Sequence, residues 1–273
     1  MDYTLDLPGG ADAVLLGHGL CGNPLELIHL AKRLNQVGYT VRVPFIPGYG
    51  VSGKLTRIRA YRDWLTSFEL EFDDLRGKHR TVSVGGLCIG ATLALALAAR
   101  RATQVDALLL ISTTLFYDGW NVPITRKLLP LAYLPGIRHW YRHRETTPYG
   151  IKNLRLREWI ADQMRSTGVS AAGAAHLPMT AIYQAQRLIW NARRTLPTVK
   201  APTLILHAVE DDVAGPRSPR HVLATIGSAD IELRWFHDSY HMLTIDNEKE
   251  DVARAAIEFL NTRTGDTRAK EAA

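Results

Sequence analysis

Short apolar runs alternate with longer amphipathic segments along most of this chain. The short runs, rich in valine, isoleucine and leucine, predict strands over residues 13–16, 39–45, 81–87, 107–112, 202–207 and 231–236. Apolar positions at helical spacing predict a helix over residues 61–76, and an N-cap followed by proline at residues 23–24 predicts one over residues 24–37. Alanine and leucine, both strong helix formers, predict a helix over residues 89–101, and a closing helix is expected over residues 248–260. Strands that alternate with helices favour βαβ units, so we predict an α/β fold with a mostly parallel sheet flanked by helices.

One long segment interrupts this alternation. It lies between the strands near positions 110 and 205, and it has prolines at 123, 130, 135, 148 and 178 but no clear strand. A plain crossover between parallel strands needs only about 12 residues, so we predict an insertion with helices of its own, a helical cap. The predicted division is a core of residues 1–112 and 199–262, a cap of residues 113–198 and a flexible polar tail of residues 263–273.

Charge is distributed unevenly along the chain. The 273 residues include 33 Lys and Arg against 27 Asp and Glu, a net charge of +6. Residues 113–198 contain 12 basic and 4 acidic residues, a charge of +8, so the rest of the chain carries −2. Two interpretations fit this excess: solvated helix faces, or a surface that attracts an anion such as a phosphorylated acyl carrier or a lipid headgroup. No nucleic-acid recognition motif accompanies the charge, so we expect no nucleic-acid partner.

The apolar runs are all shorter than the roughly 18–20 residues that a helix needs to cross a bilayer. The stretch MDYTLDLPGG lacks the basic start and the apolar run of a secretory signal. Two cysteines, Cys21 and Cys88, do not make a disulfide framework, and a reducing compartment is the simpler assumption. We therefore expect a cytoplasmic protein without an integral membrane segment.

The most informative short motif is GLCIG, residues 86–90, which joins a predicted strand to a predicted helix. A nucleophile elbow forces its central residue into a strained backbone conformation, and glycine two positions away on each side avoids collisions with the adjoining strand and helix. Cys88 is then at the N-terminus of the following helix, where the partial positive charge favours a thiolate. We predict that Cys88 is a catalytic nucleophile, and a merely structural, buried cysteine is the alternative.

A nucleophile of this kind needs a base and a group that orients the base, in the chain order nucleophile, acid, histidine. His241 follows the last predicted strand and is our candidate base, with His237, closer to the strand, as its competitor. The acid is expected in the loop after strand 202–207, where Asp211 and Asp212 are adjacent. Spacing by itself does not choose between these two carboxylates.

Two backbone N–H groups are expected to bind the oxyanion of the reaction. One belongs to Ile89, directly after the nucleophile. The other is expected in the loop of residues 17–23, after the first buried strand, where Leu20 is our candidate. We expect the neighbouring Cys21 to be a small buried side chain.

The predicted cap contains no residue that we assign to substrate binding. Several of its apolar side chains either line an acyl pocket or pack the cap's own helices, namely Leu128, Leu129, Leu131, Tyr133, Ile137 and Trp140. His139 and His143 have the i, i+4 spacing of metal ligands, but no Glu or Cys completes a ligand set. We therefore expect neither a metal nor a cofactor.

Together these residues resemble the α/β-hydrolase fold, and more narrowly its bacterial carboxylesterase and monoacylglycerol lipase-like group. The likeness runs from about residue 12 to 262, apart from the cap. Residues 16–24, LGHGLCGNP, are similar to the group's oxyanion segment, which reads HG, an apolar residue, then TGNP. Residues 47–50 are similar to its PGHG loop, with Tyr49 in place of histidine, and Asp63-Trp64 matches a tryptophan at the start of the next helix.

The second half of the chain carries two further matches to this group. Residues 207–214, HAVEDDVA, with Ser218 resemble the group's acid loop HGxxDxVV followed by serine. Residues 239–246, SYHMLTID, are similar to its ending SxHxxTxD. The resemblance therefore implies Asp211 rather than Asp212 as the acid, and His241 rather than His237 as the base.

The nucleophile departs from this group, because its esterases use serine. In the wider superfamily the GxCxG form occurs in dienelactone hydrolases and polyhydroxyalkanoate synthases. A thiolate is a better leaving group than an alkoxide, so thioesters and activated esters suit Cys88 better than simple alkyl esters. We predict hydrolysis of an ester or thioester through a triad of Cys88, His241 and Asp211 and an acyl-thioester intermediate. The alternatives are acyl transfer or ring closure, with coenzyme A or an acyl carrier protein as donor at the basic cap, and a non-catalytic binding protein on a hydrolase scaffold.

Overall fold

The computed structural model describes residues 3–50, 57–170 and 172–271. Its centre is a seven-stranded sheet with the strand order β1-β3-β2-β4-β5-β10-β11. The strands are β1 (Leu5–Leu7), β2 (Asp12–Gly17), β3 (Thr40–Val43), β4 (Thr81–Leu87), β5 (Leu108–Ile111), β10 (Thr203–Ala208) and β11 (Ile231–Phe236). Only β1 runs antiparallel to its neighbour, and all other neighbouring pairs are parallel. The predicted mostly parallel sheet is confirmed.

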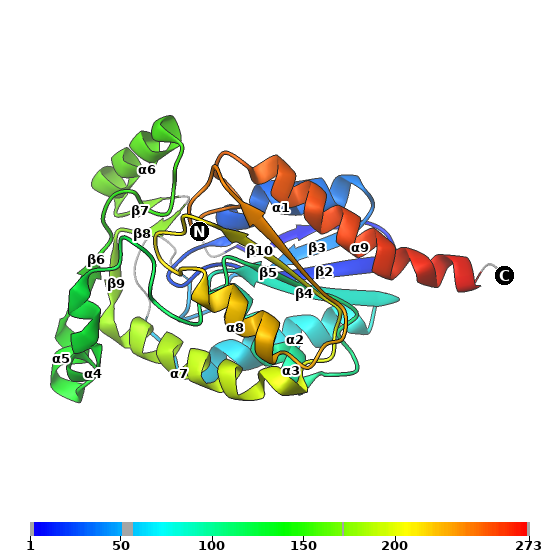
Figure 1. Ribbon diagram of the computed structural model, residues 1–273, viewed down its shortest axis with the longest axis horizontal. Coiled ribbons are helices and arrows are strands. Elements are labelled where there is room, and N and C mark those ends of the chain that lie inside the picture. Colours follow the sequence, from blue (N-terminus) through cyan, green and yellow to red (C-terminus); the bar gives the residue numbers. More distant parts are fainter. Residues whose placement is uncertain (1–2, 51–56, 171, 272–273) are drawn as a thin grey trace.

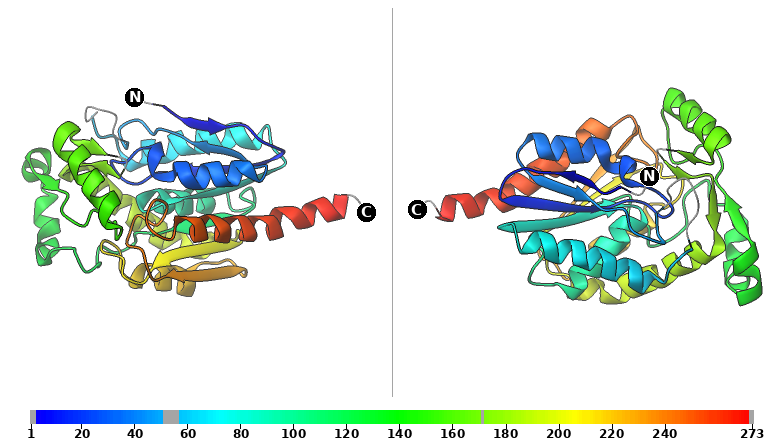
Figure 2. Two further views of the ribbon diagram at one scale, coloured as in Figure 1. Left: turned by 90° about the horizontal axis from the view of Figure 1, so that it is seen from above. Right: turned by 180° about the vertical axis from the view of Figure 1, so that it is seen from behind.

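Helices cover both faces of this sheet (Figures 1 and 2). On one face lie α2 (Tyr61–Arg76), α3 (Ile89–Arg100), α7 (Met179–Thr195) and α8 (Arg217–Thr225). On the other lie α1 (Ile28–Gln36), which follows the 3-10 turn η1 (Pro24–Leu27), and α9 (Lys249–Glu271). Within β2, Ala13 and Leu15 belong to the apolar cluster that contains residues of α2, α3, α7 and α8. Val14 and Leu16 belong to the cluster on the other face, which contains residues of α1 and α9. Both faces of the central strands are therefore buried, as is usual for parallel strands.

Between β5 and β10 the chain forms an insertion of helices and short strands. Its helices are η2 (Ile124–Leu128), α4 (Leu129–Ala132), α5 (Pro135–Trp140), α6 (Leu154–Thr167), α7 and the 3-10 turn η3 (Leu196–Thr198). Two antiparallel pairs accompany them, β6 (Arg142–Arg144) with β9 (His176–Pro178), and β7 (Val169–Ser170) with β8 (Gly173–Ala174). The expectation of no strand in this segment is wrong, because strands of two or three residues are too short to show an alternating pattern.

Helix α7 belongs to this segment in sequence but packs against the core. Its residues Ala185, Leu188 and Ile189 are buried in the same apolar cluster as α3. The predicted boundary between cap and core at residue 198 stays a prediction, because α7 lies in the predicted cap but covers the sheet of the core.

The end of the chain also differs from the prediction. Helix α9 continues to Glu271 instead of ending near residue 260, and the division of the chain at residue 263 stays a prediction. Residues 272–273, the end of the predicted tail, lie outside the described residues. In the part of the chain that is described, no helix combines the length and apolar character that a membrane crossing requires.

The parallel strands determine where a site can form. Strands β2, β4, β5, β10 and β11 run in one direction, so the loops after their last residues meet at one edge of the sheet. The insertion lies at this edge (Figure 1). It is joined there by hydrogen bonds such as that from Ala174 N–H to the Cys21 carbonyl, at 3.1 Å. In open α/β sheets, ligands bind at this carboxyl edge.

Candidate active site

Cys88 occupies a sharp turn between β4 and α3. Its backbone has φ 59° and ψ −118°, a left-handed conformation that a residue with a side chain adopts rarely and at a cost. The Cys88 N–H donates to the Ile111 carbonyl at 3.0 Å, which ties the turn to the neighbouring strand. The side chain is half-buried, so the turn presents the sulfur at the carboxyl edge, as the sequence predicted.

The two glycines of the motif allow two backbones to approach each other. A Cβ on Gly86 would lie 2.6 Å from the Gly17 carbonyl oxygen, which is too close for any real contact. A Cβ on Gly90 would overlap with the carbonyl oxygens of Gly17 and His18. The loop that follows β2 therefore lies directly against the first turn of α3.

His241 and Asp211 form a buried pair at the same edge. The His241 Nδ1 atom is 2.9 Å from Asp211 Oδ1 and 2.8 Å from Oδ2. Asp211 Oδ1 also accepts from the N–H groups of Val213 and Ala214, at 2.9 and 2.7 Å. These bonds hold the carboxylate in place, and they make Nε2 the only ring nitrogen of His241 that is available to another group.

The electrostatic environment joins Cys88 to this pair. Burial by itself lowers the pKa of His241, but the Asp211 carboxylate and then the Cys88 sulfur raise this pKa well above its usual value. Burial raises the pKa of Asp211, whereas His241 and His207 lower it, and the net direction is downward. The His241 Nε2 atom is buried without a hydrogen-bond partner among the residues described. Catalytic hydrogen bonds are often long in a ligand-free enzyme and tighten with substrate, so this arrangement suits proton exchange with Cys88.

The two competing residues lie elsewhere. Asp212 Oδ2 accepts from the Gly150 N–H at 3.1 Å, and its Oδ1 accepts from the backbone N–H of His241 at 3.4 Å. Asp212 thus ties the insertion to the loop of the base without touching the imidazole. His237 is exposed, and its N–H donates to Glu248 at 3.1 Å. The structure brings Asp211 and His241 together and leaves Asp212 and His237 in other roles.

The two predicted oxyanion donors occupy suitable backbone positions. Ile89 is the first residue of α3, where N–H groups have no acceptor within the helix. Leu20 lies in the turn after β2, between two residues whose N–H groups are engaged: Gly19 donates to Glu26 at 2.6 Å and Cys21 donates to the Tyr49 carbonyl at 3.1 Å. The Leu20 N–H has no acceptor within the described ranges. It is therefore free to bind a ligand.

Buried side chains support this oxyanion loop. The Tyr49 hydroxyl donates to the His18 carbonyl at 2.5 Å, and the Trp64 indole donates to the Gly48 carbonyl at 2.9 Å. Tyr49, which replaces the histidine of the related motif, thus stabilises the loop of residues 17–23 by a hydrogen bond to its backbone. Cys21 is fully buried, as predicted, and burial raises its pKa to about 12, so its thiol is unsuited to act as a nucleophile.

Thr114 contacts the nucleophile, and the sequence analysis did not identify it. Its hydroxyl lies 3.4 Å from Cys88 Sγ and 3.4 Å from the Ser112 carbonyl, so its single hydrogen serves one acceptor at a time. Ser218 Oγ accepts from the N–H groups of Leu115 and Phe116, at 3.2 and 3.1 Å, and so holds the loop that carries Thr114. The available signal in the sequence was the polar run of residues 112–114, which directly follows β5, the neighbour of the strand that leads to Cys88.

Two carboxyl groups near the base were also missed. Glu26, in η1, is 2% exposed, and no Lys or Arg pairs with it among the residues described. Burial raises the pKa of Glu26 to about 7 and that of Glu145, in the insertion, also to about 7, where Asp212 adds to the effect. Because His241 lowers both values, both carboxyls lie within its electrostatic range. No sequence pattern reveals burial of this kind.

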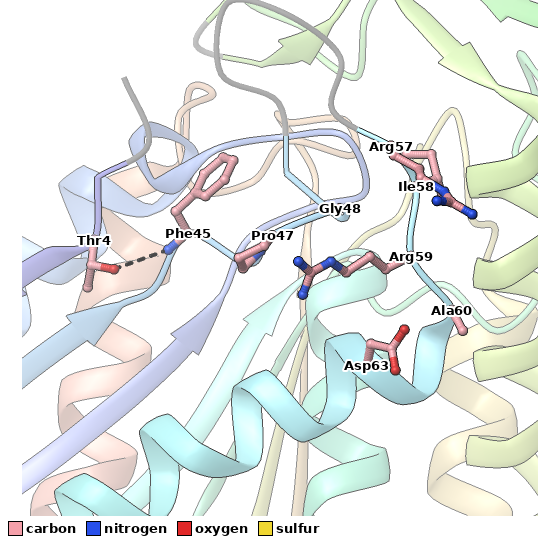
Figure 3. Close-up of a pocket in the computed structure, with 9 residues that line it drawn as sticks. All are labelled: Thr4, Phe45, Pro47, Gly48, Arg57, Ile58, Arg59, Ala60 and Asp63. Carbon is pink, nitrogen blue, oxygen red and sulfur yellow. Dashed lines mark hydrogen bonds between the residues drawn. The ribbon is translucent and has the colours of Figure 1, made fainter.

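A pocket of about 930 Å³ opens at another place, between the loop after β3 and the start of α2 (Figure 3). The Arg59 side chain extends across it toward Pro47 and Gly48. Cys88 and His241 do not line this pocket, so it is distinct from the site above. Within the described chain no group of three or more His, Cys, Asp or Glu side chains could hold a metal ion.

Comparisons with known proteins agree with this architecture. Residues 11–250 match the family described as serine aminopeptidase, S33. A thermostable monoacylglycerol lipase of Bacillus sp. (strain H-257) is 25% identical over 256 residues, which cover 94% of this chain and 93% of that protein. A carboxylesterase of Bacillus subtilis (strain 168) is 24% identical, with 92% and 93% covered.

Solved structures are similar over nearly the whole chain. A structure from work on LipS and LipT, two metagenome-derived lipolytic enzymes, has a TM-score of 0.81 and 24% identity, covering 96% of this chain and 98% of that chain. The monoacylglycerol lipase of Paleococcus ferrophilus has a TM-score of 0.78 and 17% identity, with the same coverage. The predicted α/β-hydrolase fold is thus confirmed, and with 240 of its residues matched the chain belongs to the serine aminopeptidase S33 family.

Proposed function

We propose that this protein hydrolyses carboxylic esters or thioesters, with Cys88 as nucleophile, His241 as base and Asp211 as the group that orients the base. One observation carries the proposal: a cysteine in a strained strand-to-helix turn shares the carboxyl edge with a buried His–Asp pair, and the sulfur of this cysteine contributes to the raised pKa of the histidine. The relatives named monoacylglycerol lipase and carboxylesterase support an ester of a fatty or other acyl group as substrate.

In the first half of the reaction, His241 Nε2 takes the Cys88 proton and the sulfur attacks the carbonyl carbon of the substrate. The carbonyl oxygen becomes an oxyanion, to which the N–H groups of Leu20 and Ile89 donate. The tetrahedral adduct collapses, the bond to the leaving group breaks, and His241 returns its proton to that group. The acyl group is then a thioester of Cys88.

In the second half, His241 takes a proton from water, whose oxygen attacks the acyl-thioester carbon. Collapse of the second adduct breaks the carbon–sulfur bond and releases the carboxylic acid, and the proton returns to Cys88. An adduct on a simple alkyl ester expels sulfur more readily than alkoxide. Thioesters and activated esters are therefore the preferred substrates of a cysteine at this position.

Acyl transfer is the second candidate function. The same acyl-thioester can pass its acyl group to an amine or an alcohol when water is excluded. Exposed basic residues of the insertion, such as Arg142 and Arg144, favour an anionic donor such as coenzyme A or an acyl carrier protein.

A panel of acyl thioesters and matched alkyl esters tests both candidates, with intact-protein mass spectrometry as the readout. An acyl adduct that forms and then decays to free acid supports hydrolysis. An adduct that persists until an amine or alcohol is added supports transfer. If no substrate ever modifies the protein, both proposals fail and a non-catalytic binding role takes their place.

Three variants locate the adduct. Cys88→Ala is expected to abolish it, and Cys88→Ser is expected to shift the preference from thioesters toward alkyl esters. Cys21→Ser is the matched control. Because the Cys21 side chain is buried, this variant is expected to form the same adduct as the wild type. An adduct that survives in Cys88→Ala would contradict the assignment of the nucleophile.

A further inference from the structure

The outer end of the insertion exposes large apolar side chains to solvent. Trp140 in α5 is 89% exposed, and Ile124 in η2 is 77% exposed. Further exposed apolar residues in the same stretch are Leu128, Leu131, Leu134, Ile137 and Tyr141. We call residues 124–144 the cap-tip surface. In Figures 1 and 2, its helices α4 and α5 lie at the end of the molecule that is farthest from the C-terminus. A cluster of exposed apolar side chains on this scale marks a binding surface.

Basic side chains are interspersed with these apolar ones. The cap-tip surface contains five Lys and Arg residues and no Asp or Glu. Four of the five are exposed, namely Arg126, Lys127, Arg142 and Arg144. None of them pairs with an acidic side chain in the part of the chain that the structure describes. By contrast, Arg42 in the core binds Asp6 at 2.9 Å and Asp74 at 2.7 Å.

The other side of the same segment packs against helix α7. Tyr133, at the end of α4, packs against Tyr183 of α7 with ring centroids 5.4 Å apart, and its hydroxyl is buried. Burial raises the pKa of Tyr117 well above its usual value, with added contributions from Cys88 and Tyr133. Tyr117 thus lies within electrostatic range of both the nucleophile and α4.

We propose that the cap-tip surface binds the surface of a bilayer that contains anionic lipids. Leucine, isoleucine and tryptophan side chains enter the boundary between headgroups and acyl chains, while neighbouring Arg and Lys side chains bind lipid phosphates. Tryptophan and tyrosine, here Trp140 and Tyr141, favour this interface because their rings are amphipathic. The inference goes beyond the proposed reaction and does not depend on it.

Charge and composition select this occupant over two others. A second copy of the chain would bring the same positive charge to the contact, and the cap-tip surface has no acidic residue to balance it. A soluble anion such as coenzyme A would satisfy the arginines but leave exposed side chains such as Trp140 and Ile124 in water. An anionic bilayer satisfies both groups of side chains at once.

Co-sedimentation of the full-length protein with lipid vesicles tests the proposal. We expect binding to an equal mixture of phosphatidylcholine and phosphatidylglycerol, weak binding to phosphatidylcholine alone, and loss of binding at high salt. In Arg142→Ala/Arg144→Ala the partition coefficient is expected to fall about fivefold for each arginine removed. Ile137→Ala/Trp140→Ala is expected to reduce binding to both kinds of vesicle.

Matched controls separate a local effect from a general one. Arg33→Ala/Arg254→Ala removes the same charge from α1 and α9, and Leu70→Ala removes a 65% exposed apolar side chain from α2. Both are expected to bind like the wild type. Cys88→Ala is also expected to bind like the wild type, so the outcome does not depend on whether the chain is a hydrolase.

Several outcomes would overturn the proposal. One is equal binding by the cap-tip variants and the control variants. Another is no binding to anionic vesicles, together with coenzyme A binding that Arg142→Ala/Arg144→Ala abolishes, which would identify a soluble anion. A third is self-association without lipid that Ile137→Ala/Trp140→Ala abolishes, which would identify a second copy as the occupant.

Discussion

Asp211 and Asp212 are adjacent, yet their carboxylates bind different partners. Asp211 binds the imidazole of His241 through both oxygens, whereas Asp212 binds the backbone of Gly150 and of His241. The reason is geometric, because successive side chains of the loop point in different directions and only one of them meets the ring. Sequence spacing did not choose between the two carboxylates as partner of the base. In the structure His241 Nδ1 contacts Asp211 and not Asp212.

Replacing each acid separately tests this difference. Asp211→Asn is expected to lower kcat/KM for the best thioester substrate about 10⁴-fold, because an amide stabilises the wrong tautomer of His241. Asp212→Asn keeps an acceptor for Gly150 and is expected to cost about tenfold or less. Steady-state kinetics of both variants check this, and a larger loss in Asp212→Asn would refute the assignment.

Thr114 is a positioning residue in the site, since its hydroxyl can turn from the Ser112 carbonyl to the Cys88 sulfur when the sulfur is ionised. Thr114→Val keeps the shape and removes this donor. Alkylation of Cys88 by iodoacetamide at neutral pH is expected to slow about tenfold, since hydrogen bonds to charged groups contribute about 1.5–3 kcal/mol. Thr114→Ser is expected to restore the rate. Equal rates in wild type and Thr114→Val would show that the contact has no effect on the sulfur.

At the scale of elements, the strand-to-helix turn after β4 depends on close backbone packing. Gly86→Ala places a methyl group 2.6 Å from the Gly17 carbonyl oxygen and is expected to reduce the free energy of unfolding by about 1–3 kcal/mol. Gly136→Ala is the control, because its Cβ meets nothing within 4 Å and Ala favours the helix by up to about 1 kcal/mol. Urea unfolding of both variants measures the difference, and equal stabilities would contradict the packing argument.

Elements differed in how well the sequence predicted them. Strands β2 and β4 and helices α2 and α3 were anticipated closely, because β2 and β4 are continuous apolar runs, α2 is amphipathic and α3 is rich in alanine and leucine. Strand β1 and helix α8 were missed. The three residues of β1 pair with β3 only through tertiary contact, and α8 is a short helix that begins with Arg-Ser-Pro. The strands of the insertion were missed for the same reason of length.

For the molecule as a whole, a buried carboxyl without a cationic partner makes stability depend on pH. The pKa of Glu26 is raised from 4.5 to about 7 by burial. Between these values the unfolded chain is ionised at Glu26 while the folded protein retains the proton, so stability falls as pH rises. The maximum slope from one such group is about 1.4 kcal/mol per pH unit.

Glu26→Gln removes this contribution and keeps an acceptor for the Gly19 N–H. We therefore expect the variant to gain stability relative to the wild type as pH rises from 4.5 to 7, by up to about 3 kcal/mol. Urea unfolding across this pH range measures the difference between the two proteins. Parallel stability curves would mean that Glu26 does not titrate there. Glu145 is present in both proteins, whereas the interaction of His241 with Glu26 is part of the measured difference.

The sequence by itself determined the α/β class, the order of the main strands and helices, and the GLCIG turn at Cys88, because these follow from periodicity and local backbone chemistry. The resemblance of residues 207–214 to a known acid loop already implied Asp211, but only the tertiary structure decided that Thr114 reaches the sulfur, that Glu26 is buried and that the large apolar side chains of residues 124–144 remain exposed. Each of these is a distance or a burial that depends on segments far apart in the chain, and no local pattern encodes it.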